Sequence, residues 1–185
     1  MPDVFCHPQA LVESDEIGDG TRVWAFAHVM KGARVGRDCN IGDHAFIESG
    51  AVVGDRVTIK NQVQIWDKVV IGDDVFVGPG VVFTNDLVPR VKFRRGPGEW
   101  LPTVVSGGAS IGANATIVCG TEIGRNAFIG AGSVVTTDVA NHALVVGNPA
   151  RWVGWVCECG LRLDGELTCR CGRTYEFDGS GLTST

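Results

Sequence analysis

Four cysteines close to the C-terminus have the residue type and spacing of a metal site. They form two Cys-X-Cys-Gly units, Cys157 with Cys159 and Cys169 with Cys171, and nine residues separate the units. Four soft thiolate ligands supplied by two turns are the arrangement of a zinc ribbon, whose closed site holds a structural zinc ion. Zinc ribbons usually have two residues between paired cysteines and this chain has one, so free or redox-active thiols are the alternative.

A second feature is the basic segment 84–104, which reads TNDLVPRVKFRRGPGEWLPTV. Guanidinium and ammonium groups bind phosphates and carboxylates, so the segment favours an anionic ligand. A solvated surface insertion is the alternative. Its cations are Arg90, Lys92, Arg94 and Arg95.

A repeat in the sequence indicates the scaffold that positions these residues. An apolar residue occupies every sixth position from Phe5 through Leu11 to Phe83. A second small or β-branched residue, such as Ala27 or Val57, follows most of these anchors by four positions. Neither an α-helix nor a simple strand has this period, whereas a stacked solenoid does. We therefore expect an all-β parallel β-helix with three hexads to a turn and the anchors pointing inward.

The six-residue period stops after Phe83 and resumes at Val105, twenty-two residues later. Because this distance is not a multiple of six, residues 84–104 are expected to form a loop excursion that leaves and re-enters the wall. Roughly twenty hexads predict a helix of about seven coils. The expected domains are a β-helix over residues 1–155 and a small Cys-rich, zinc-ribbon-like tail over residues 156–185.

Residues eighteen apart should lie above one another in neighbouring coils, separated by about 4.8 Å. Asn85 is therefore expected above Asp67, and these two residues flank the point where the wall opens. His28 precedes Asn85 by just over three coils, so about 15 Å should separate them.

Composition narrows the classes of function. The net charge of −5 argues against a general nucleic-acid-binding protein. Neither a signal peptide nor eighteen consecutive apolar residues are found, so we expect a cytoplasmic protein without a membrane partner.

The hexads resemble those of the hexapeptide-repeat acyltransferase superfamily, whose coils are left-handed and whose members usually form trimers. A closer similarity lies in GTRVWAFAHVMKGARVGRDCNIG, NQVQIWDKVVIGDDVFVGPGVVFTND, GASIGANATIVCGTEIGRNAFIGAGSVVTTDV and VVGNPAR. These segments resemble N-acetyltransferases of nucleotide-linked 3-amino sugars, over nearly the whole of residues 5–155. The nearest group acts on UDP-2-acetamido-3-amino-2,3-dideoxy-glucuronate, and dTDP-3-amino-sugar enzymes are close relatives.

The resemblance implies acetyl transfer from acetyl-CoA to the 3-amino group of a nucleotide sugar, for precursors of cell-surface polysaccharides or glycoconjugates. It implies that Asn85 holds the amine, with help from Asp67. An amide cannot act as a general base at neutral pH, so the neutral amine would attack directly and the departing sulfur would take its proton. The basic loop favours a UDP-linked amino-uronate, and a dTDP-linked 3-amino-deoxysugar is the alternative.

The remaining site residues follow from the same resemblance. His28 would lie near the nucleotide end of the substrate, and Arg90, Lys92 and Arg94 would bind its anionic groups. Coenzyme A would lie between two prisms of a homotrimer, with sites between subunits. The cofactor-binding candidates are Gly130, Ala131 and Arg151. His142 is either a cap of the prism or a neighbour of the cofactor.

Two other classes of protein fit the sequence less well. A γ-class carbonic anhydrase shares the prism but needs three histidines around zinc, two of them a short step apart. The four histidines at positions 7, 28, 44 and 142 offer no such pair. A noncatalytic scaffold would have no use for the basic loop, Asn85 and the GNPAR segment.

Overall fold

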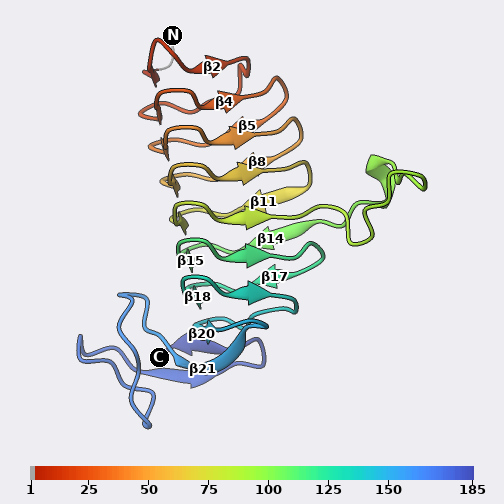
Figure 1. Ribbon diagram of the computed structural model, residues 1–185. Coiled ribbons are helices and arrows are strands. Elements are labelled where there is room, and N and C mark those ends of the chain that lie inside the picture. The colour runs from red at the N-terminus through yellow and green to blue at the C-terminus, as the bar shows by residue number, and fades with distance from the viewer. Residues whose placement is uncertain (1–2) are drawn as a thin grey trace.

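The computed structural model describes residues 3–185, and it is a parallel β-solenoid with the two ends of the chain at opposite ends of the stack (Figure 1). Within residues 3–185 the one helical element is a 3-10 turn, η1 (Pro97–Glu99). None of the helices in the described part of the chain could span a membrane. The prediction of an all-β parallel helix is confirmed.

Three sheets form the walls of the prism. The first sheet contains β1 (Phe5–Cys6), β3 (Arg22–Val23), β6 (Asn40–Ile41), β9 (Thr58–Ile59), β12 (Phe76–Val77), β15 (Ser110–Ile111), β18 (Phe128–Ile129), β20 (Ala143–Val146) and the antiparallel β21 (Arg151–Trp155). The second sheet contains β2 (Leu11–Val12), β4 (His28–Val29), β7 (Phe46–Ile47), β10 (Gln64–Ile65), β13 (Val82–Phe83), β16 (Thr116–Ile117) and β19 (Val134–Val135). The third sheet contains β5 (Arg34–Val35), β8 (Val52–Val53), β11 (Val69–Ile71), β14 (Thr103–Val105) and β17 (Glu122–Ile123).

The described strands of the first sheet give the solenoid about eight turns, one more than expected. The last turn ends in β20, which follows β18 by sixteen residues rather than eighteen, as the pairing of Phe128 with Leu144 shows. The six-residue spacing therefore ends before β20, although Val145 of this strand is still buried in the core.

The interior consists of the anchors and their small partners, which are almost fully buried; Ile41, Ile47, Ile59 and Ile65 are 0% exposed. Most bends contain one residue in the left-handed backbone conformation, which glycine adopts without steric cost. Gly32 and Gly50 supply it at two bends, but Arg56 (φ 57°), Gln62 (φ 63°) and Lys68 (φ 66°) supply it at others. None of the residues in this conformation is β-branched, as the steric limits of that region require.

The first turn differs from the sequence prediction. Phe5 pairs with Arg22 and Leu11 with His28, so this turn is one residue shorter than eighteen. A one-residue shift reverses the face of a strand, and Phe5 (46% exposed) and Leu11 (54% exposed) point away from the core. The prediction that these two anchors point inward is wrong.

The excursion begins after β13 and ends at β14. Val82 pairs with Gln64 below it, eighteen residues away, and with Thr116 above it, thirty-four residues away. The loop therefore adds sixteen residues to one turn and leaves the stacking of the turns intact. It projects sideways from the prism at the level between β11 and β14 (Figure 1).

At the C-terminal end the chain reverses through Gly147–Ala150, and β21 runs antiparallel to β20. Beyond it, β22 (Tyr175–Phe177) and β23 (Leu182–Ser184) form a hairpin. A second small core forms in this tail from Cys157, Leu163, Cys169, Tyr175 and Leu182.

The register of the first turn leads to a test of stability. We expect Ile47→Ala to lower the free energy of unfolding by about 2–5 kcal/mol, because it leaves a cavity between stacked turns. Leu11→Ala is the matched control, since Leu11 is also an anchor in the count by sixes; it should cost less than about 1 kcal/mol because its side chain is exposed. Denaturant unfolding of the two variants measures the difference, and equal losses would contradict the shifted register.

Candidate functional site

Asn85 lies at the corner where β13 ends and the loop begins. The strand register puts it one level above Asp67 and one level below Cys119. Its carbonyl oxygen accepts a hydrogen bond from the Leu101 N–H at 3.2 Å, on the returning limb of the loop. Its backbone is thereby fixed from both ends of the loop, and its half-buried side chain has no hydrogen-bond partner within residues 3–185.

Asp67 lies below Asn85, but its carboxylate is directed toward the preceding turn. Oδ1 lies so close to Gly50 that a Cβ on that glycine would be 2.3 Å away. The Asp67 N–H donates to Glu48 Oε2 at 2.8 Å. Neither the Asn85 amide nor the Asp67 carboxylate has a hydrogen-bond partner among residues 3–185, but the carboxylate packs against Gly50 whereas the amide is free of such a contact.

The basic loop is exposed along residues 87–99. The side chains of Arg90, Lys92 and Arg94 make no hydrogen bond or ion pair with any of the described residues. Between them, Val91 is 83% and Phe93 is 77% exposed. The loop thus presents cations and apolar side chains together, away from its own prism.

His28 lies on the outer face of the second sheet, three levels from Val82. Its Nε2 is 2.9 Å from Glu13 Oε2, and its ring lies edge-on to Phe46 with 5.4 Å between centroids. Phe46 in turn packs against Trp66 at 5.5 Å. These three rings form a column, here called the aromatic column, that leads from His28 up to the corner of Asn85.

His142 is buried between the last turn and the tail. Its Nδ1 lies 2.9 Å from the Val156 carbonyl and its Nε2 3.2 Å from Asn126 Nδ2, while its ring packs on Tyr175. Burial lowers the pKa of His142 below its ordinary value. Of the two readings of the sequence, these contacts fit a cap of the prism.

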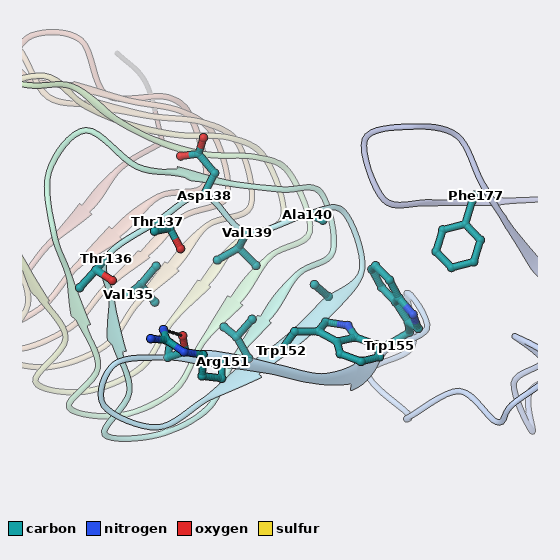
Figure 2. A pocket seen from close by; sticks show the side chains of 13 residues that line it. Val135, Thr136, Thr137, Asp138, Val139, Ala140, Arg151, Trp152, Trp155 and Phe177 are labelled. Atoms are coloured by element: carbon teal, nitrogen blue, oxygen red, sulfur yellow. Dashed lines mark hydrogen bonds between the residues drawn. The ribbon is translucent and has the colours of Figure 1, made fainter.

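A pocket of about 560 Å³ lies at the C-terminal end of the prism (Figure 2). Apolar residues of the last turn that are nearly buried, including Val135 and Val139, line it. Trp152, Trp155 and Phe177 also line it, and the Trp155 ring lies edge-on to each of the other two. The sequence analysis did not identify these aromatic residues; the WVGW run after GNPAR was the available signal.

Of the three cofactor candidates, Arg151 lines this pocket, whereas Gly130 and Ala131 lie on a neighbouring bend. A Cβ on Gly130 would come within 2.7 Å of Val146 Cγ1, and Val146 pairs with Arg151 across β20 and β21. Gly130 therefore permits the packing of the strand that leads to Arg151.

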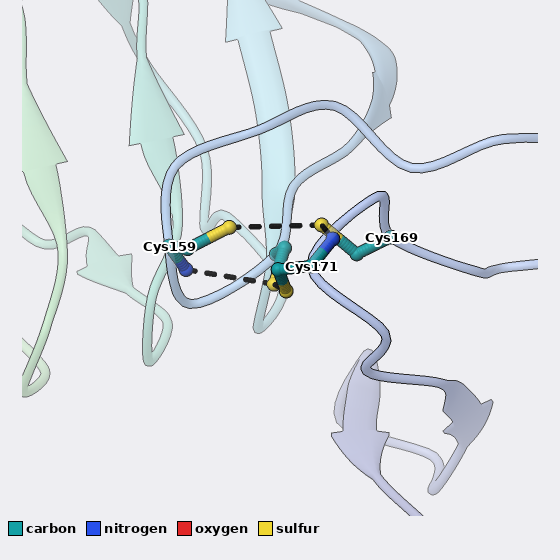
Figure 3. A group of neighbouring side chains, drawn as sticks. Cys159, Cys169 and Cys171 are labelled. Carbon is teal, nitrogen blue, oxygen red and sulfur yellow. Dashed lines mark hydrogen bonds between the residues drawn. The ribbon is translucent and has the colours of Figure 1, made fainter.

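The four tail cysteines converge, as Figure 3 shows for Cys159, Cys169 and Cys171. Their sulfur atoms all lie within 4.8 Å of one another, with 3.5 Å between Cys157 and Cys171 and 3.6 Å between Cys159 and Cys169. A zinc ion with four sulfur ligands at about 2.3 Å would require sulfur–sulfur separations of about 3.8 Å, so the group fits. No other group of three or more potential ligands occurs within residues 3–185.

Hydrogen bonds to the sulfur atoms support the same conclusion. The Tyr175 hydroxyl donates to Cys157 Sγ at 3.0 Å, and the Arg173 guanidinium donates to Cys171 Sγ at 3.3 Å. Hydrogen bonds from the backbone N–H and the side chain of Arg173 lower the pKa of Cys171 to about 6. Metal binding requires deprotonated thiols, so the surroundings of Cys171 suit a ligand, whereas desolvation and hydrogen bonds with the other sulfur atoms raise the pKa of Cys169 in the metal-free group.

Comparison with known proteins agrees with the fold. Residues 16–49, 50–85 and 102–137 match the bacterial transferase hexapeptide (six repeats) family. The chain is 50% identical over 183 residues to the dTDP-3-amino-3,6-dideoxy-alpha-D-galactopyranose 3-N-acetyltransferase of Aneurinibacillus thermoaerophilus, across 97% of this chain and 94% of that enzyme.

Solved structures of similar fold include a hexapeptide-repeat acetyltransferase from Vibrio cholerae complexed with acetyl coenzyme A. Its TM-score is 0.58 at 28% identity, over 68% of this chain and 72% of that one. The acetyltransferase domain of PglB from Neisseria gonorrhoeae, with a TM-score of 0.53 at 21% identity over 82% of this chain and 58% of that one, shares the fold. The chain belongs to the bacterial hexapeptide-repeat transferase family and is an acetyltransferase.

Proposed function

We propose that the chain transfers the acetyl group of acetyl-CoA to the 3-amino group of a dTDP-linked 3-amino-deoxysugar. The observation that carries this proposal is the 50% identity, across nearly the full length of both chains, to an enzyme named for that reaction. The preference for a UDP-linked amino-uronate is not supported. That preference rested on the basic loop, and its cations can bind the diphosphate of either nucleotide as well as a carboxylate.

The proposed chemistry depends on Asn85. The amide oxygen of Asn85 accepts an N–H of the substrate and aims the nitrogen lone pair at the thioester carbonyl. The C–N bond forms, the C–S bond breaks, and the amine proton passes to the departing sulfur, so the products are an amide and the thiol of coenzyme A. Asp67 supports the corner from below, and holding the two reactants in place supplies much of the rate.

The two substrates would lie along opposite directions from Asn85. The nucleotide would lie along the aromatic column toward His28, and Arg90, Lys92 and Arg94 would bind its phosphates. Acetyl-CoA would extend the other way, past Gly130 and Ala131 to Arg151. This path is supported by Thr137, which shares the column of corner residues with Asn85 and lines the pocket that contains Arg151.

We further propose a homotrimer with sites between subunits. The loop projects from its own prism and exposes Val91 and Phe93, which a neighbouring subunit would cover. Val70, Phe76 and Val82 are also partly exposed on the three walls. Contact between prisms would bring the basic loop of one chain to the groove of the next.

For the tail we propose a structural zinc ion bound by Cys157, Cys159, Cys169 and Cys171. The ion would supply rigidity and no reactive position, because all four ligands come from the protein. Its effect on the rest of the chain would pass through Trp155, which ends β21 two residues before Cys157 and contacts Phe177 of the tail.

The proposed function is tested by thiol release from acetyl-CoA with a panel of UDP- and dTDP-linked 3-amino sugars. We expect the best dTDP-linked 3-amino-deoxysugar to exceed the UDP-linked amino-uronate in kcat/KM by at least about tenfold. A higher kcat/KM with the UDP-linked amino-uronate would contradict the proposal and favour that substrate instead. If no member of the panel is acetylated, the alternative of a noncatalytic scaffold would be favoured.

The role of Asn85 is tested with the best substrate of that panel. We expect Asn85→Ala to lower kcat by about 100-fold, because the variant can no longer orient the amine. Asp67→Asn should lower kcat by less than about tenfold, because the Asp67 carboxylate is directed at Gly50. Thr58→Ala on the first sheet is the control, and unchanged turnover by Asn85→Ala would refute the assignment.

Metal analysis tests the tail. We expect about one zinc ion per chain by elemental mass spectrometry and almost none in Cys171→Ser, because the site needs four ligands. Chelation should lower the melting temperature of the wild type. Cys6→Ser is the matched control, since Cys6 is an exposed cysteine outside the group and its loss should leave the zinc content unchanged. A metal-free wild type would favour free thiols.

A further inference from the structure

Three consecutive residues at one corner, Trp66, Asp67 and Lys68, lie directly below the loop. The Trp66 indole N–H donates to the carbonyl oxygen of Phe83 at 2.8 Å. Phe83 is the last residue of β13, so this bond holds the chain where the loop departs. Trp66 itself is partly buried against the core, which gives the contact a rigid base.

Lys68 holds the opposite end of the loop. Its ammonium group donates to the carbonyl oxygen of Trp100 at 3.0 Å and to that of Pro97. Its own carbonyl oxygen accepts the Thr103 N–H at 3.1 Å, at the start of β14. Lys68 therefore contacts both η1 and the first residue of the returning strand.

The returning limb, residues 97–103, in turn fixes Asn85. The Leu101 N–H donates to the Asn85 carbonyl, and the Gly120 N–H donates to the Pro102 carbonyl from the next turn. The Leu101 side chain covers Gly120, where a Cβ would be 3.0 Å from Leu101 Cδ1. A displaced limb would remove the partner of the Asn85 backbone while the prism below stayed intact.

We propose that Lys68 is a positioning residue that clamps the returning limb of the loop and thereby fixes Asn85 for the reaction. Lys68 does not touch the substrate; it acts through Trp100 and Leu101. A lysine suits this task because an ammonium group offers three donors on a long stem and so can serve two carbonyls at once. No carboxylate lies within ion-pair distance of Lys68 among the described residues, so those carbonyls are its partners.

The kinetic part of this inference rests on the proposed function, whereas the structural part does not. Without the clamp the loop is still attached at Trp66 and at β14, but its returning limb can open. The four trypsin sites of the loop, Arg90, Lys92, Arg94 and Arg95, are already exposed, and opening should loosen the backbone around them so that trypsin cleaves it faster. Opening should also misplace Asn85 and lower turnover.

The experiment compares Lys68→Met, Lys68→Arg and the control Lys60→Met in the full chain. We expect Lys68→Met to raise the rate of tryptic cleavage within residues 90–95 by about tenfold, since protection there reports local opening. It should lower kcat/KM by about tenfold through kcat, because misplacement affects the reacting geometry. Lys68→Arg should restore most of both properties. Lys60 makes no side-chain hydrogen bond within the described residues, and its variant should behave as wild type.

The melting temperature separates a clamp from general damage, and it should stay close to that of the wild type because the contacts of Lys68 lie outside the core. If Lys68→Met is cleaved at the wild-type rate and keeps the wild-type kcat/KM, the proposal is overturned. Faster cleavage with unchanged kcat/KM would overturn the positioning role. If the wild type acetylates no amino sugar, the proposed function fails, and the cleavage rates alone decide whether the clamp exists.

Discussion

Every turn of this solenoid depends on its neighbours to bury its inward side chains. A turn of eighteen residues has no core of its own, so Ile47, Ile59 and Ile65 are covered only because further turns lie above and below. The parallel backbone hydrogen bonds impose one spacing on the stack, and a left-handed residue at most bends keeps the anchors pointing inward. The ends are the exceptions: Phe5 and Leu11 are exposed at one end, and the tail packs against the other.

This constraint explains why the loop can be long. Its sixteen added residues enter at a corner, between β13 and β14, and both strands keep their partners. The entropy of closing a loop grows only slowly with its length, so the cost of this insertion is small beside the stacking that it leaves unchanged. The proposed binding groups thus lie on two supports, Asn85 on the rigid wall and the cations on the loop that projects from it.

The features that depend on the six-residue period could be predicted from the sequence. Features that lie where the period ends could not. The walls, the buried columns and the level of Asn85 above Asp67 follow from counting, because each position repeats the same environment. The shift at Leu11 could not be found this way, since an exposed and a buried leucine are identical in a pattern. The bond between Lys68 and Trp100 joins residues thirty-two apart across an irregular loop, and the direction of the Asp67 carboxylate depends on Gly50 below it. Neither carries a periodic signal.

The positions of the histidines limit the chemistry at the corner. His28 lies three levels from the loop and is paired with Glu13, and His142 is buried beside Tyr175 with a lowered pKa. An amide at the corner can orient an amine but cannot take its proton. In the proposed reaction the sulfur atom of the leaving group is therefore the acceptor, and the protein contributes geometry rather than a base. A reaction that depends on geometry is sensitive to small displacements of the group that orients the nucleophile. In that proposal Lys68, although it reaches no substrate, belongs to the same functional unit as Asn85, and the hydrogen bond from Trp66 to Phe83 holds the other end of the loop.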